Sequence, residues 1–487
     1  MTGLPAAGPL SSPARRAMAN IERYPPMRSF DAIIIGAGQA GPALAGRLSE
    51  AGQSVAIVER HHVGGTCVNT GCRPTKTLVA SAYAMHTARR GAEYGFTVAG
   101  PIAADMKAVA ARADKIIREG RAGNENWLFG MANVELVRGH ARFEASNIVA
   151  VAGERLTAPR IFINVGGRAV VPDMPGIGDV PILTNTDIVA LDTLPRHLVV
   201  IGGSYIGLEF AQMYRRFGAA VTVVERMGRL IAREDEDVSH AMREILEAEG
   251  ISVRTDADCI GFAAKGDDIE VRVDCAYDAQ PVLASHVLMA VGRRPNTDDL
   301  GLDATGIALD ARGYITVDDQ LRTNVPGVWA LGDCNGRGAF THTAYNDFEI
   351  VAANLLDREE RGVSQRLPGY ALYTDPPLAR AGMTDAQALA TGRPLLRATR
   401  PMSRVGRAVE KGETQGFMKV VADAETRRIL GAAILGTGGD EAIHGILDMM
   451  NADQPVEQLR WAVPIHPTVS ELIPTVLLDL QPWKGNA

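Results

Sequence analysis

The chain has 487 residues, of which 46% are apolar and 22% are charged, and its length predicts about two to four globular domains. A formal net charge of −7, with no basic stripe along the chain, argues against nonspecific nucleic-acid binding. The longest apolar runs fall short of the roughly eighteen residues that a transmembrane helix needs, so we expect no membrane span.

The cysteines and the first 29 residues bear on the compartment. Of five cysteines, Cys67 and Cys72 lie close together and Cys259, Cys275 and Cys334 are scattered, which is not the framework of a secreted protein. We therefore expect a reducing, cytoplasmic compartment. Residues 1–29 are rich in Pro, Ala, Ser and Arg and lack the apolar core of a secretory signal. They predict a disordered leader, with organellar targeting through the arginines as the alternative.

A dinucleotide-binding fingerprint begins at residue 32. It consists of an apolar strand at 32–35, a turn with Gly36, Gly38 and Gly41, and a helix at 42–51. A second strand at 55–58 follows and ends at the acid Glu59. The glycines allow a tight turn and close approach of a pyrophosphate, the helix N-terminus attracts its charge, and an acid about twenty residues on accepts from a ribose hydroxyl. Because all parts occur together, the segment predicts a dinucleotide site.

The next segment, residues 64–76, reads GGTCVNTGCRPTK. Its two cysteines, Cys67 and Cys72, are five positions apart where we expect a helix to start. One helical turn would bring them to nearly the same face, where the sulfurs could close a small disulfide ring. A helix N-terminus would also lower a thiol pKa. Two buried free cysteines are the alternative, but the flanking glycines and the preceding phosphate loop favour a redox site.

A second fingerprint follows two predicted helices, 77–90 and 105–127, and a small antiparallel layer over 134–165. It comprises a strand at 197–201, a turn, a helix at 208–217 and a second strand at 221–225. The turn consists of Gly202, Gly203, Ser204, Tyr205, Ile206 and Gly207. Ser204 stands where the second glycine is expected, and a small residue there still permits close approach. Two such units in one chain predict two nucleotide cofactors.

Glu225 ends the second strand of this unit. A carboxylate there accepts from a free ribose 2′-hydroxyl and repels a 2′-phosphate, which favours NADH. Arg226 and Arg229 follow at once and could recruit the phosphate instead, so use of both nucleotides stays open.

From about residue 369 the pattern changes to an α+β module, with strands near 395–398, 417–421 and 429–435 and helices after them. Near its end, His466 and Glu471 lie five positions apart across a proline turn. A carboxylate so placed can hydrogen-bond the imidazole, fix its tautomer and raise its basicity.

The segment GGTCVNTGCRPTK resembles the active-site segment of the class I pyridine nucleotide-disulfide oxidoreductases, which include dihydrolipoamide dehydrogenase, glutathione reductase and mercuric reductase. The wording CVNTGC-x-PTKTLVASA is most similar to the mercuric-reductase-like branch. Residues 290–296 resemble the family's return from the nicotinamide domain, residues 323–333 its second flavin signature, and residues 466–471 its acid/base dyad. The resemblance covers nearly all of the chain from Phe30 onward.

This resemblance implies an α/β fold with two Rossmann-like dinucleotide-binding domains, for FAD and NAD(P), and a C-terminal α+β dimerisation domain. The expected boundaries are 1–29 for the leader, 30–170 and 296–368 for the two parts of the FAD domain, 171–295 for the NAD(P) domain and 369–487 for the dimerisation domain. It also implies a homodimer whose subunits share each active site, with NADH preferred over NADPH and no metal cofactor.

The resemblance assigns roles to individual residues. The catalytic set is Cys72 as the charge-transfer thiol, Cys67 as the interchange thiol, His466 as the acid oriented by Glu471, and Lys76 paired with Glu209 beside the flavin. Tyr205 is expected to cover the flavin as a gate to the nicotinamide pocket. The flavin contacts are expected from Gly36, Gly38, Gly41, Glu59, Arg60, Gly65, Thr66, Lys76, His140, Ala141, Gly166, Gly332 and Asp333. The nicotinamide contacts are expected from Gly202, Gly203, Ser204, Tyr205, Ile206, Gly207, Glu225, Arg226 and Gly292.

The predicted activity is an NAD(P)H:disulfide oxidoreductase that passes electrons through FAD and the Cys67–Cys72 disulfide to a substrate disulfide. Two alternatives stay open: a mercuric- or cupric-type metal-ion reductase, and a dihydrolipoamide dehydrogenase that runs in the oxidative direction. A non-catalytic flavoprotein is disfavoured because both half-sites are intact. Arg73 stands where an aliphatic side chain is expected, and either contacts an anionic substrate or caps solvent.

Overall fold

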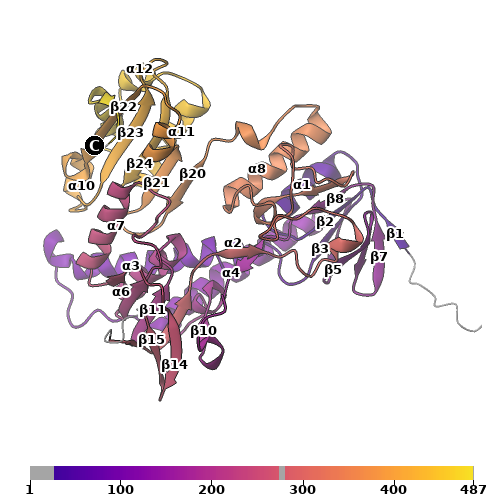
Figure 1. The fold of residues 1–487 in the computed structure, drawn as a ribbon, viewed down its shortest axis with the longest axis horizontal. Helices are drawn as coiled ribbons and strands as arrows, with labels where there is room; N and C mark the ends of the chain where they lie inside the picture. Colours follow the sequence, from indigo (N-terminus) through magenta and orange to yellow (C-terminus); the bar gives the residue numbers. More distant parts are fainter. Residues whose placement is uncertain (1–26, 274–279, 486–487) are drawn as a thin grey trace, which may run out of the picture.

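The computed structural model describes residues 27–273 and 280–485, which form six sheets with helices around them (Figure 1). The three largest, two parallel and one antiparallel, each belong to one unit of the fold. The predicted α/β fold class is confirmed. Contrary to the expectation of a disordered leader up to residue 29, Met27–Ser29 forms strand β1, which pairs with β7, and Arg28 forms an ion pair with Glu154 at 3.1 Å. Residues 1–26 of the expected leader lie outside the described residues.

The first sheet is parallel throughout, with five strands in the order β19-β8-β2-β3-β4. All four residues of β2 are buried, because elements cover both faces of the sheet. Helix α1 packs against α8, and a four-stranded layer lies beside the sheet (Figure 1). The elements are β2 Ala32–Ile35, α1 Ala40–Glu50, β3 Val55–Glu59, β4 Val134–Arg138, β5 Ala141–Ala145, β6 Ile148–Val151, β7 Glu154–Thr157, β8 Ile161–Ile163, β19 Val328–Ala330 and α8 Thr341–Ala352.

The second sheet is also parallel, in the order β10-β17-β11-β12-β13. A two-stranded ribbon of β9 and β18 connects it with the first sheet, and a three-stranded antiparallel layer packs against it through a shared apolar core. The elements are β9 Gly167–Ala169, β10 Ile182–Leu183, α5 Asn185–Ile188, β11 His197–Ile201, α6 Tyr205–Phe217, β12 Ala220–Val224, α7 Glu236–Ala248, β13 Ser252–Arg254, β14 Gly261–Lys265, β15 Asp268–Arg272, β16 Val282–Ala284, β17 His286–Met289 and β18 Arg293–Pro295.

The third sheet is antiparallel, with six strands in the order β20-β21-β24-β23-β22-β25. Helix α11 packs against β24 and β21, and buried apolar residues of the strands and helices form its core. The elements are β20 Gly369–Leu372, β21 Leu378–Gly382, α9 Asp385–Ala390, β22 Leu395–Pro401, α10 Gly406–Glu410, β23 Phe417–Asp423, β24 Ile429–Leu435, α11 Gly439–Asn451, α12 Val456–Arg460, α13 Ile473–Leu478 and β25 Gln481–Trp483.

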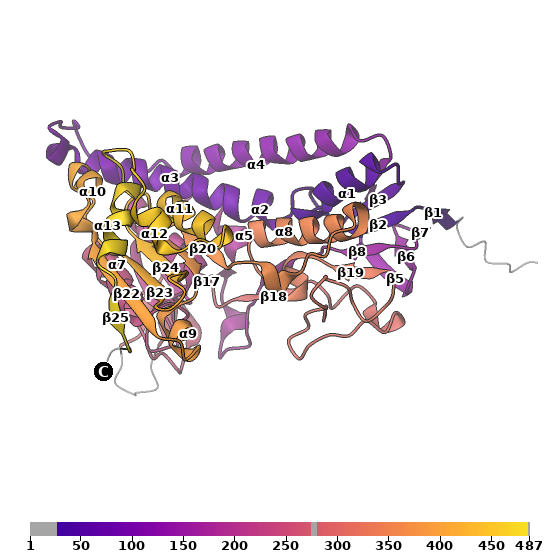
Figure 2. The same cartoon turned by 90° about the horizontal axis from the view of Figure 1, so that it is seen from above.

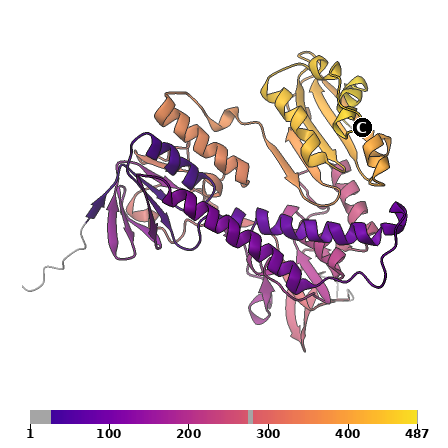
Figure 3. The same ribbon diagram turned by 180° about the vertical axis from the view of Figure 1, so that it is seen from behind.

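Three helices link the first sheet to the rest of the molecule: α2 Gly65–Asn69, α3 Cys72–Arg89 and α4 Met106–Phe129. Helix α3 packs on both α4 and α6, so it joins the first unit to the second. Figure 2 shows α3 and α4 running lengthwise along one side of the molecule, and Figure 3 shows the same pair from behind. Among the described residues, no helix is both long enough and apolar enough to cross a membrane.

Candidate active site

The first glycine loop is built around contacts that exclude side chains. A Cβ on Gly36, which has φ of +104°, would lie 2.3 Å from the carbonyl oxygen of Asn164, and one on Gly41 would lie 2.4 Å from the carbonyl oxygen of Gly36. A Cβ on Gly38 would have Nδ2 of Asn164 as its nearest protein atom, at 3.5 Å. Gly36 and Gly41 therefore serve the turn itself, whereas Gly38 leaves the loop surface open for a ligand. Asn164, which sequence reasoning missed, donates from Nδ2 to the oxygen of Gly36 at 3.1 Å.

Glu59 sits at the end of β3 and holds the same loop. Its carboxylate accepts from the backbone N–H of Ala37 at 3.0 Å and from that of His61 at 2.8 Å. Further along the sheet edge, Asp299 pairs with Arg60 at 2.8 Å, and its carbonyl oxygen lies 3.0 Å from Nε2 of His140. These expected flavin contacts thus gather at one edge of the first sheet, where Ala141 is buried at the start of β5.

The redox segment packs directly on this loop. The N–H of Gly64 donates to the oxygen of Ala37 at 2.8 Å, and a Cβ on Gly65, which has φ of +59°, would lie 2.8 Å from Cα of Gly38. The lack of a side chain at Gly65 therefore lets the two segments touch. Thr66 is half-buried within hydrogen-bonding reach of Arg293, at 3.4 Å.

The two cysteines do not share one helix, which corrects the expectation of a single helical turn. Cys67 lies in the short helix α2, which ends at Asn69, and Cys72 begins α3. Between them, a Cβ on Gly71 would lie 2.9 Å from the carbonyl oxygen of Thr66, so the chain bends there as only glycine allows. The amide of Asn185 donates to the freed carbonyl oxygen of Thr70 at 2.8 Å.

The pair is in the dithiol form, with Cys67 half-buried and Cys72 exposed. Hydrogen bonding from Cys67, then from Thr341, and the charge of Lys76 outweigh desolvation and lower the pKa of Cys72 to about 6. The same bond to Cys72, together with burial, raises the pKa of Cys67 far above its usual range. Cys72 is therefore the thiolate of the pair near neutral pH, and Cys67 keeps its proton.

Thr341 is a site residue that sequence reasoning missed. It begins α8, and its Oγ1 lies 3.2 Å from Sγ of Cys72. A threonine at a helix start carries no signal of its own, and only the packing of α8 shows its position. Nearby, Nε2 of His342 lies 2.7 Å from the carbonyl oxygen of Gly369.

Lys76 and Glu209 form the pair that the resemblance implied. Nζ of Lys76, one turn after Cys72, lies 2.8 and 2.9 Å from the two carboxylate oxygens of Glu209 on α6. The carboxylate also accepts from the N–H of Tyr373 at 2.9 Å, and the Lys76 ammonium lies 4.6 Å from the centre of the Tyr373 ring. The pair joins the redox helix to both other units.

The second flavin signature delivers Gly332 and Asp333 next to the ribbon between the sheets. Burial raises the pKa of Asp333, and Arg293, whose Nε lies 3.6 Å from its carboxylate, opposes the shift. Gly332 donates its N–H to the buried carboxylate of Asp347 at 2.8 Å. Asp347, which sequence reasoning missed, also accepts from Asn335 at 2.8 Å and so fixes this turn. Cys334 is wholly buried, and burial raises its pKa to about 12, as suits a structural residue.

The second glycine loop repeats the construction of the first. A Cβ on Gly202 would lie 2.5 Å from the oxygen of Ala290, and one on Gly207 would lie 2.0 Å from the oxygen of Gly202. Ser204 takes the place that Gly38 holds in the first loop and is exposed, as is Ile206. The Cβ positions of Gly166 and Gly292 have no protein atom within 4 Å, so both backbones can be approached closely. The cradles therefore fit two dinucleotides.

Glu225 occupies in this loop the place of Glu59 in the first. Its carboxylate accepts from the N–H of Gly203 at 2.6 Å and from that of Met227 at 2.8 Å. Arg226 is exposed, and within the described ranges its guanidinium makes no hydrogen bond or ion pair. Arg229 instead folds back, donating to the carbonyl oxygens of Ala232 at 3.1 Å and Glu234 at 3.2 Å.

Tyr205 is anchored by a residue that sequence reasoning missed. Its hydroxyl donates to Oε1 of Glu234 at 3.0 Å, and the hydroxyl of Tyr370 donates to the same oxygen at 2.5 Å. Arg380 donates from Nε to the other carboxylate oxygen at 2.7 Å. Burial and the Glu234 charge raise the pKa of Tyr205, so the phenol stays protonated. The ring also lies 6.5 Å from that of Phe340.

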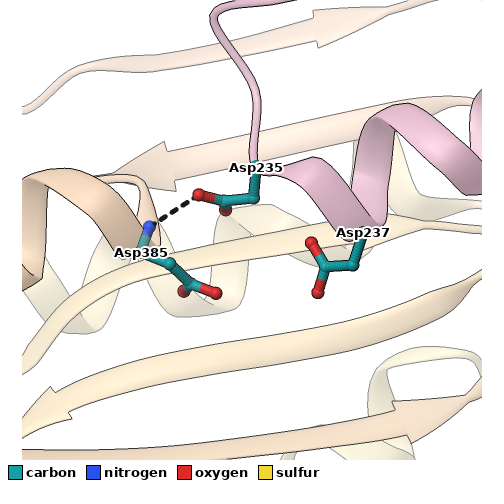
Figure 4. Close-up of side chains that lie close together, drawn as sticks. All are labelled: Asp235, Asp237 and Asp385. Carbon is teal, nitrogen blue, oxygen red and sulfur yellow. Dashed lines mark hydrogen bonds between the residues drawn. The ribbon is translucent and has the colours of Figure 1, made fainter. Parts of the chain in front are cut away.

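Three carboxylates gather between the second and third units: Asp235, Asp237 and Asp385 (Figure 4). Lys419, which is 2% exposed, reaches all three, with Nζ at 2.8, 2.7 and 3.0 Å from their oxygens. Arg380 donates to Asp235 at 2.7 Å. Burial alone would raise the pKa of Asp235, but these cations outweigh it and hold the pKa below its usual range. The ammonium of Lys419 therefore occupies the place where a metal ion would bind.

His466 and Glu471 form the hydrogen bond that their spacing suggested, with Nδ1 and Oε2 at 2.8 Å. The His466 side chain is 80% exposed, and Glu471 is largely buried. Trp461, Val463 and Ile465 just before it are exposed apolar side chains. Over the parts of the chain that the structure describes, no hydrogen bond or ion pair links this dyad to Cys67 or Cys72, so one subunit does not by itself assemble the whole predicted set.

Two dinucleotide cradles, a dithiol with one lowered pKa at their junction and a separate antiparallel unit define a two-cofactor dithiol oxidoreductase. Comparison with protein families agrees. Residues 30–347 match the family described as pyridine nucleotide-disulphide oxidoreductase, and residues 369–477 match its dimerisation domain. The chain belongs to the pyridine nucleotide-disulfide oxidoreductase family. It is an oxidoreductase and a flavoprotein that uses FAD and NAD(P), and the dimerisation domain indicates a homodimer.

Curated relatives divide among three activities. The chain is 34% identical over 454 residues to the probable pyridine nucleotide-disulfide oxidoreductase RclA of Escherichia coli (strain K12), covering 91% of this chain and 98% of the relative. It is also 34% identical to a dihydrolipoyl dehydrogenase of Thermus scotoductus, covering 91% and 96%, and to a mercuric reductase of Streptomyces lividans, covering 91% and 94%.

Solved structures show the same fold. The HOCl-induced flavoprotein disulfide reductase RclA from Escherichia coli matches with a TM-score of 0.84 and 33% identity, covering 92% of this chain and 99% of that chain. The Cu(II) complex of the same reductase matches with a TM-score of 0.85 and 32% identity, covering 93% and 99%.

Proposed function

We propose that the enzyme transfers two electrons from NADH through FAD to the Cys67–Cys72 pair and on to a small-molecule disulfide. The observation that supports this most is the thiol pair, in which Cys72 has a pKa of about 6 at the start of α3 and Cys67 lies beside it. Bound FAD would accept a hydride from the nicotinamide and supply electrons to the cysteines. The loop of Gly36 to Gly41 and Glu59 would hold it, with the Lys76–Glu209 pair beside it.

The disulfide step follows from thiol chemistry. The Cys67 thiolate attacks one sulfur of the substrate, the substrate S–S bond breaks, and a mixed disulfide with Cys67 forms while the other half leaves as a thiolate and takes a proton. The Cys72 thiolate then attacks Sγ of Cys67. The Cys67–Cys72 disulfide closes and the second half leaves as a thiolate, which takes a proton from water. The substrate has then gained two electrons and two protons, one of them from Cys67.

The first attack needs a base, because Cys67 is protonated in the dithiol form. The His466 side chain is exposed next to the apolar residues Trp461, Val463 and Ile465, which suits burial against a second copy. We infer that His466 of the partner subunit takes the Cys67 proton and returns it to the leaving thiolate. Glu471 holds the imidazole tautomer for both transfers.

NADH is the proposed reductant because Glu225 is fixed at the end of the second glycine loop, where it would accept from both ribose hydroxyls. The free guanidinium of Arg226 is the group that would admit NADPH as well. Glu225→Ala should then lower the ratio of NADH activity to NADPH activity. Arg226→Gln should lower NADPH activity more than NADH activity. The proposed compartment is the cytoplasm, where NADH is available.

The experiment that tests the function is turnover with NADH and NADPH against lipoamide, oxidised glutathione, an aromatic disulfide, Hg(II) and Cu(II). His466→Gln is measured beside the wild type. Reduction of a disulfide that falls by about 10²- to 10⁴-fold in the mutant supports the proposal, because the leaving thiolate needs the acid. Measuring dihydrolipoamide oxidation by NAD⁺ in the same series tests the oxidative direction that the Thermus scotoductus relative suggests.

Metal-ion reduction is the second candidate, favoured by the mercuric reductase relative and by the Cu(II) complex of the RclA structure. Soft thiolates such as the Cys67–Cys72 pair bind such ions. If only Hg(II) or Cu(II) is reduced, and His466→Gln leaves that rate unchanged, this candidate replaces the disulfide substrate.

A further inference from the structure

Arg73 presents an unpaired positive charge beside the redox cysteines. It follows Cys72 at the start of α3 and is exposed. Across residues 27–273 and 280–485, its guanidinium makes no hydrogen bond and no ion pair. Most other arginines near the site are paired, as Arg293 is with Asp333 and Arg216 is with Glu249. The charge of Arg73 is therefore available to a ligand.

Glycine in the facing helix gives this side chain its position. A Cβ on Gly120 of α4 would lie 2.8 Å from Nη1 of Arg73, so a larger residue would displace the guanidinium. The same Cβ would lie 3.1 Å from the side chain of Val68, which is the neighbour of Cys67 in the chain. The guanidinium thus lies over α4, beside the short helix that carries Cys67. In agreement, the positive charge of Arg73 favours the Cys67 thiolate. The hydrogen bond to Cys72 and burial are larger effects, so the pKa of Cys67 is raised overall.

The guanidinium opens into a groove of about 310 Å³ between α3 and α4. Its wall combines an apolar surface from Ile116 and Trp127 with the amide of Asn124, and its one acidic side chain is Glu119, which faces Lys115 at 3.7 Å. Trp127 is half exposed. A short carbon chain could lie on the tryptophan while a terminal carboxylate meets Arg73.

We propose that this groove selects disulfides that carry a carboxylate a few bonds from the sulfur, with Arg73 binding the carboxylate while Cys67 attacks the S–S bond. The proposal deepens the disulfide-reductase function and rests on it. The bond changes are those given above, and Arg73 takes no part in them. Glu119 limits the groove to one carboxylate, because a second would meet its negative charge.

The test uses three disulfides of similar size that differ in charge: 3,3′-dithiodipropionate, 2-hydroxyethyl disulfide and cystamine. For the wild type we expect kcat/KM to be about tenfold higher for the dicarboxylate than for the neutral compound, as a charge-assisted hydrogen bond allows, and lowest for the diamine. The advantage should shrink as salt is raised, since the site is open to solvent. Arg73→Gln should abolish it through KM, and Arg73→Lys should restore part of it.

Arg118→Gln is the matched control. Arg118 also lies in α4, is exposed, does not line the groove, and pairs with Asp114 at 2.9 Å. Arg118→Gln changes the net charge of the protein by the same amount as Arg73→Gln. If both variants lose the kcat/KM advantage of the dicarboxylate, the effect is a general charge effect and the proposal is overturned. Equal turnover of the dicarboxylate and the neutral disulfide by the wild type would overturn it too.

A second readout needs no turnover. The reduced enzyme is alkylated with iodoacetate and with iodoacetamide, which differ in charge, and peptide mass spectrometry separates the product at Cys67 from the faster product expected at the Cys72 thiolate. The ratio of the two rates is then taken at Cys67 alone. Arg73→Gln should lower the ratio of the iodoacetate rate to the iodoacetamide rate severalfold, and Arg118→Gln should not. An unchanged ratio overturns the inference. If the ratio falls but none of the three disulfides is reduced, the disulfide-reductase function fails while the anion preference at Cys67 stands.

Discussion

The hydroxyl of Tyr205 donates to Oε1 of Glu234 at 3.0 Å. The same oxygen also accepts from the hydroxyl of Tyr370 in the antiparallel sheet. We propose, from the family resemblance, that the Tyr205 ring gates the nicotinamide pocket. A ring that moves in this way must leave its acceptor on Glu234. Tyr205→Phe keeps the ring and removes the bond, which is worth about 1.5 kcal/mol or more with a charged acceptor. We expect NAD⁺ to bind about tenfold more tightly to the variant, by calorimetry on the oxidised enzyme.

Tyr370→Phe is the control for this change, because it removes a bond to the same oxygen from outside the glycine loop. Weaker NAD⁺ binding by Tyr205→Phe would show that Glu234 holds the ring in its open position instead.

Gly36→Ala and Gly38→Ala should separate folding from cofactor binding. The added methyl at residue 36 would meet the oxygen of Asn164 at 2.3 Å, whereas at residue 38 nothing of the protein lies nearer than 3.5 Å. We expect Gly36→Ala to express poorly, and Gly38→Ala to fold with a normal circular dichroism spectrum but a lowered flavin-to-protein absorbance ratio. Full flavin content in Gly38→Ala would show that the loop surface there faces no ligand.

The rate of alkylation of Cys72 should depend on pH with a midpoint near 6. The lowered pKa means that the reactive thiolate is present above this pH and disappears as the pH falls through it. Lys76→Met removes one of the charges that favours the thiolate, so its midpoint should rise, while Lys265→Met at a distant exposed site should leave it unchanged. A midpoint that stays near the ordinary thiol value of 9.0 in the wild type would contradict the thiolate assignment.

Glu471→Gln should reduce disulfide turnover less than His466→Gln. The amide can still hydrogen-bond Nδ1 of the imidazole, but it cannot stabilise the imidazolium as a carboxylate does. We expect a loss of roughly tenfold, compared with about 10²-fold or more for the histidine change, in steady-state assays with the best disulfide. Equal losses in the two variants would mean that the carboxylate is itself essential to proton transfer.

Lys419→Met should destabilise the protein strongly. It leaves the buried Asp235 facing the partly exposed Asp237 and Asp385 without a cation between them, and breaking the buried Lys419–Asp235 pair in this way costs up to about 3–5 kcal/mol. A lower urea midpoint is expected, with Asp385→Asn in the same background recovering part of it. Addition of Mg²⁺ or Mn²⁺ to Lys419→Met tests whether the vacated cluster then accepts a cation.

Local patterns carried most of the prediction. The two glycine fingerprints, the strands that precede them and the His466–Glu471 pair depend on residues close in sequence, and their geometry follows from a few backbone rules. Asn164, Glu234 and Thr341 act on segments far away in the chain, so nothing near them in sequence marks them. The bend at Gly71 was misread because a Cys-x4-Cys spacing fits one helical turn as well as two helices.

The charges around Lys419 have a consequence for modular engineering. Asp235 and Asp237 belong to the nucleotide-binding unit, and Lys419, Arg380 and Asp385 belong to the antiparallel unit, so neither half of the network is neutral by itself. A hybrid enzyme that takes its C-terminal unit from a relative with different side chains at these positions would bury unmatched charge at the junction. A hybrid that exchanges substrate preference between relatives therefore has to take all five of these residues from the same parent, although they lie on both sides of the fusion point.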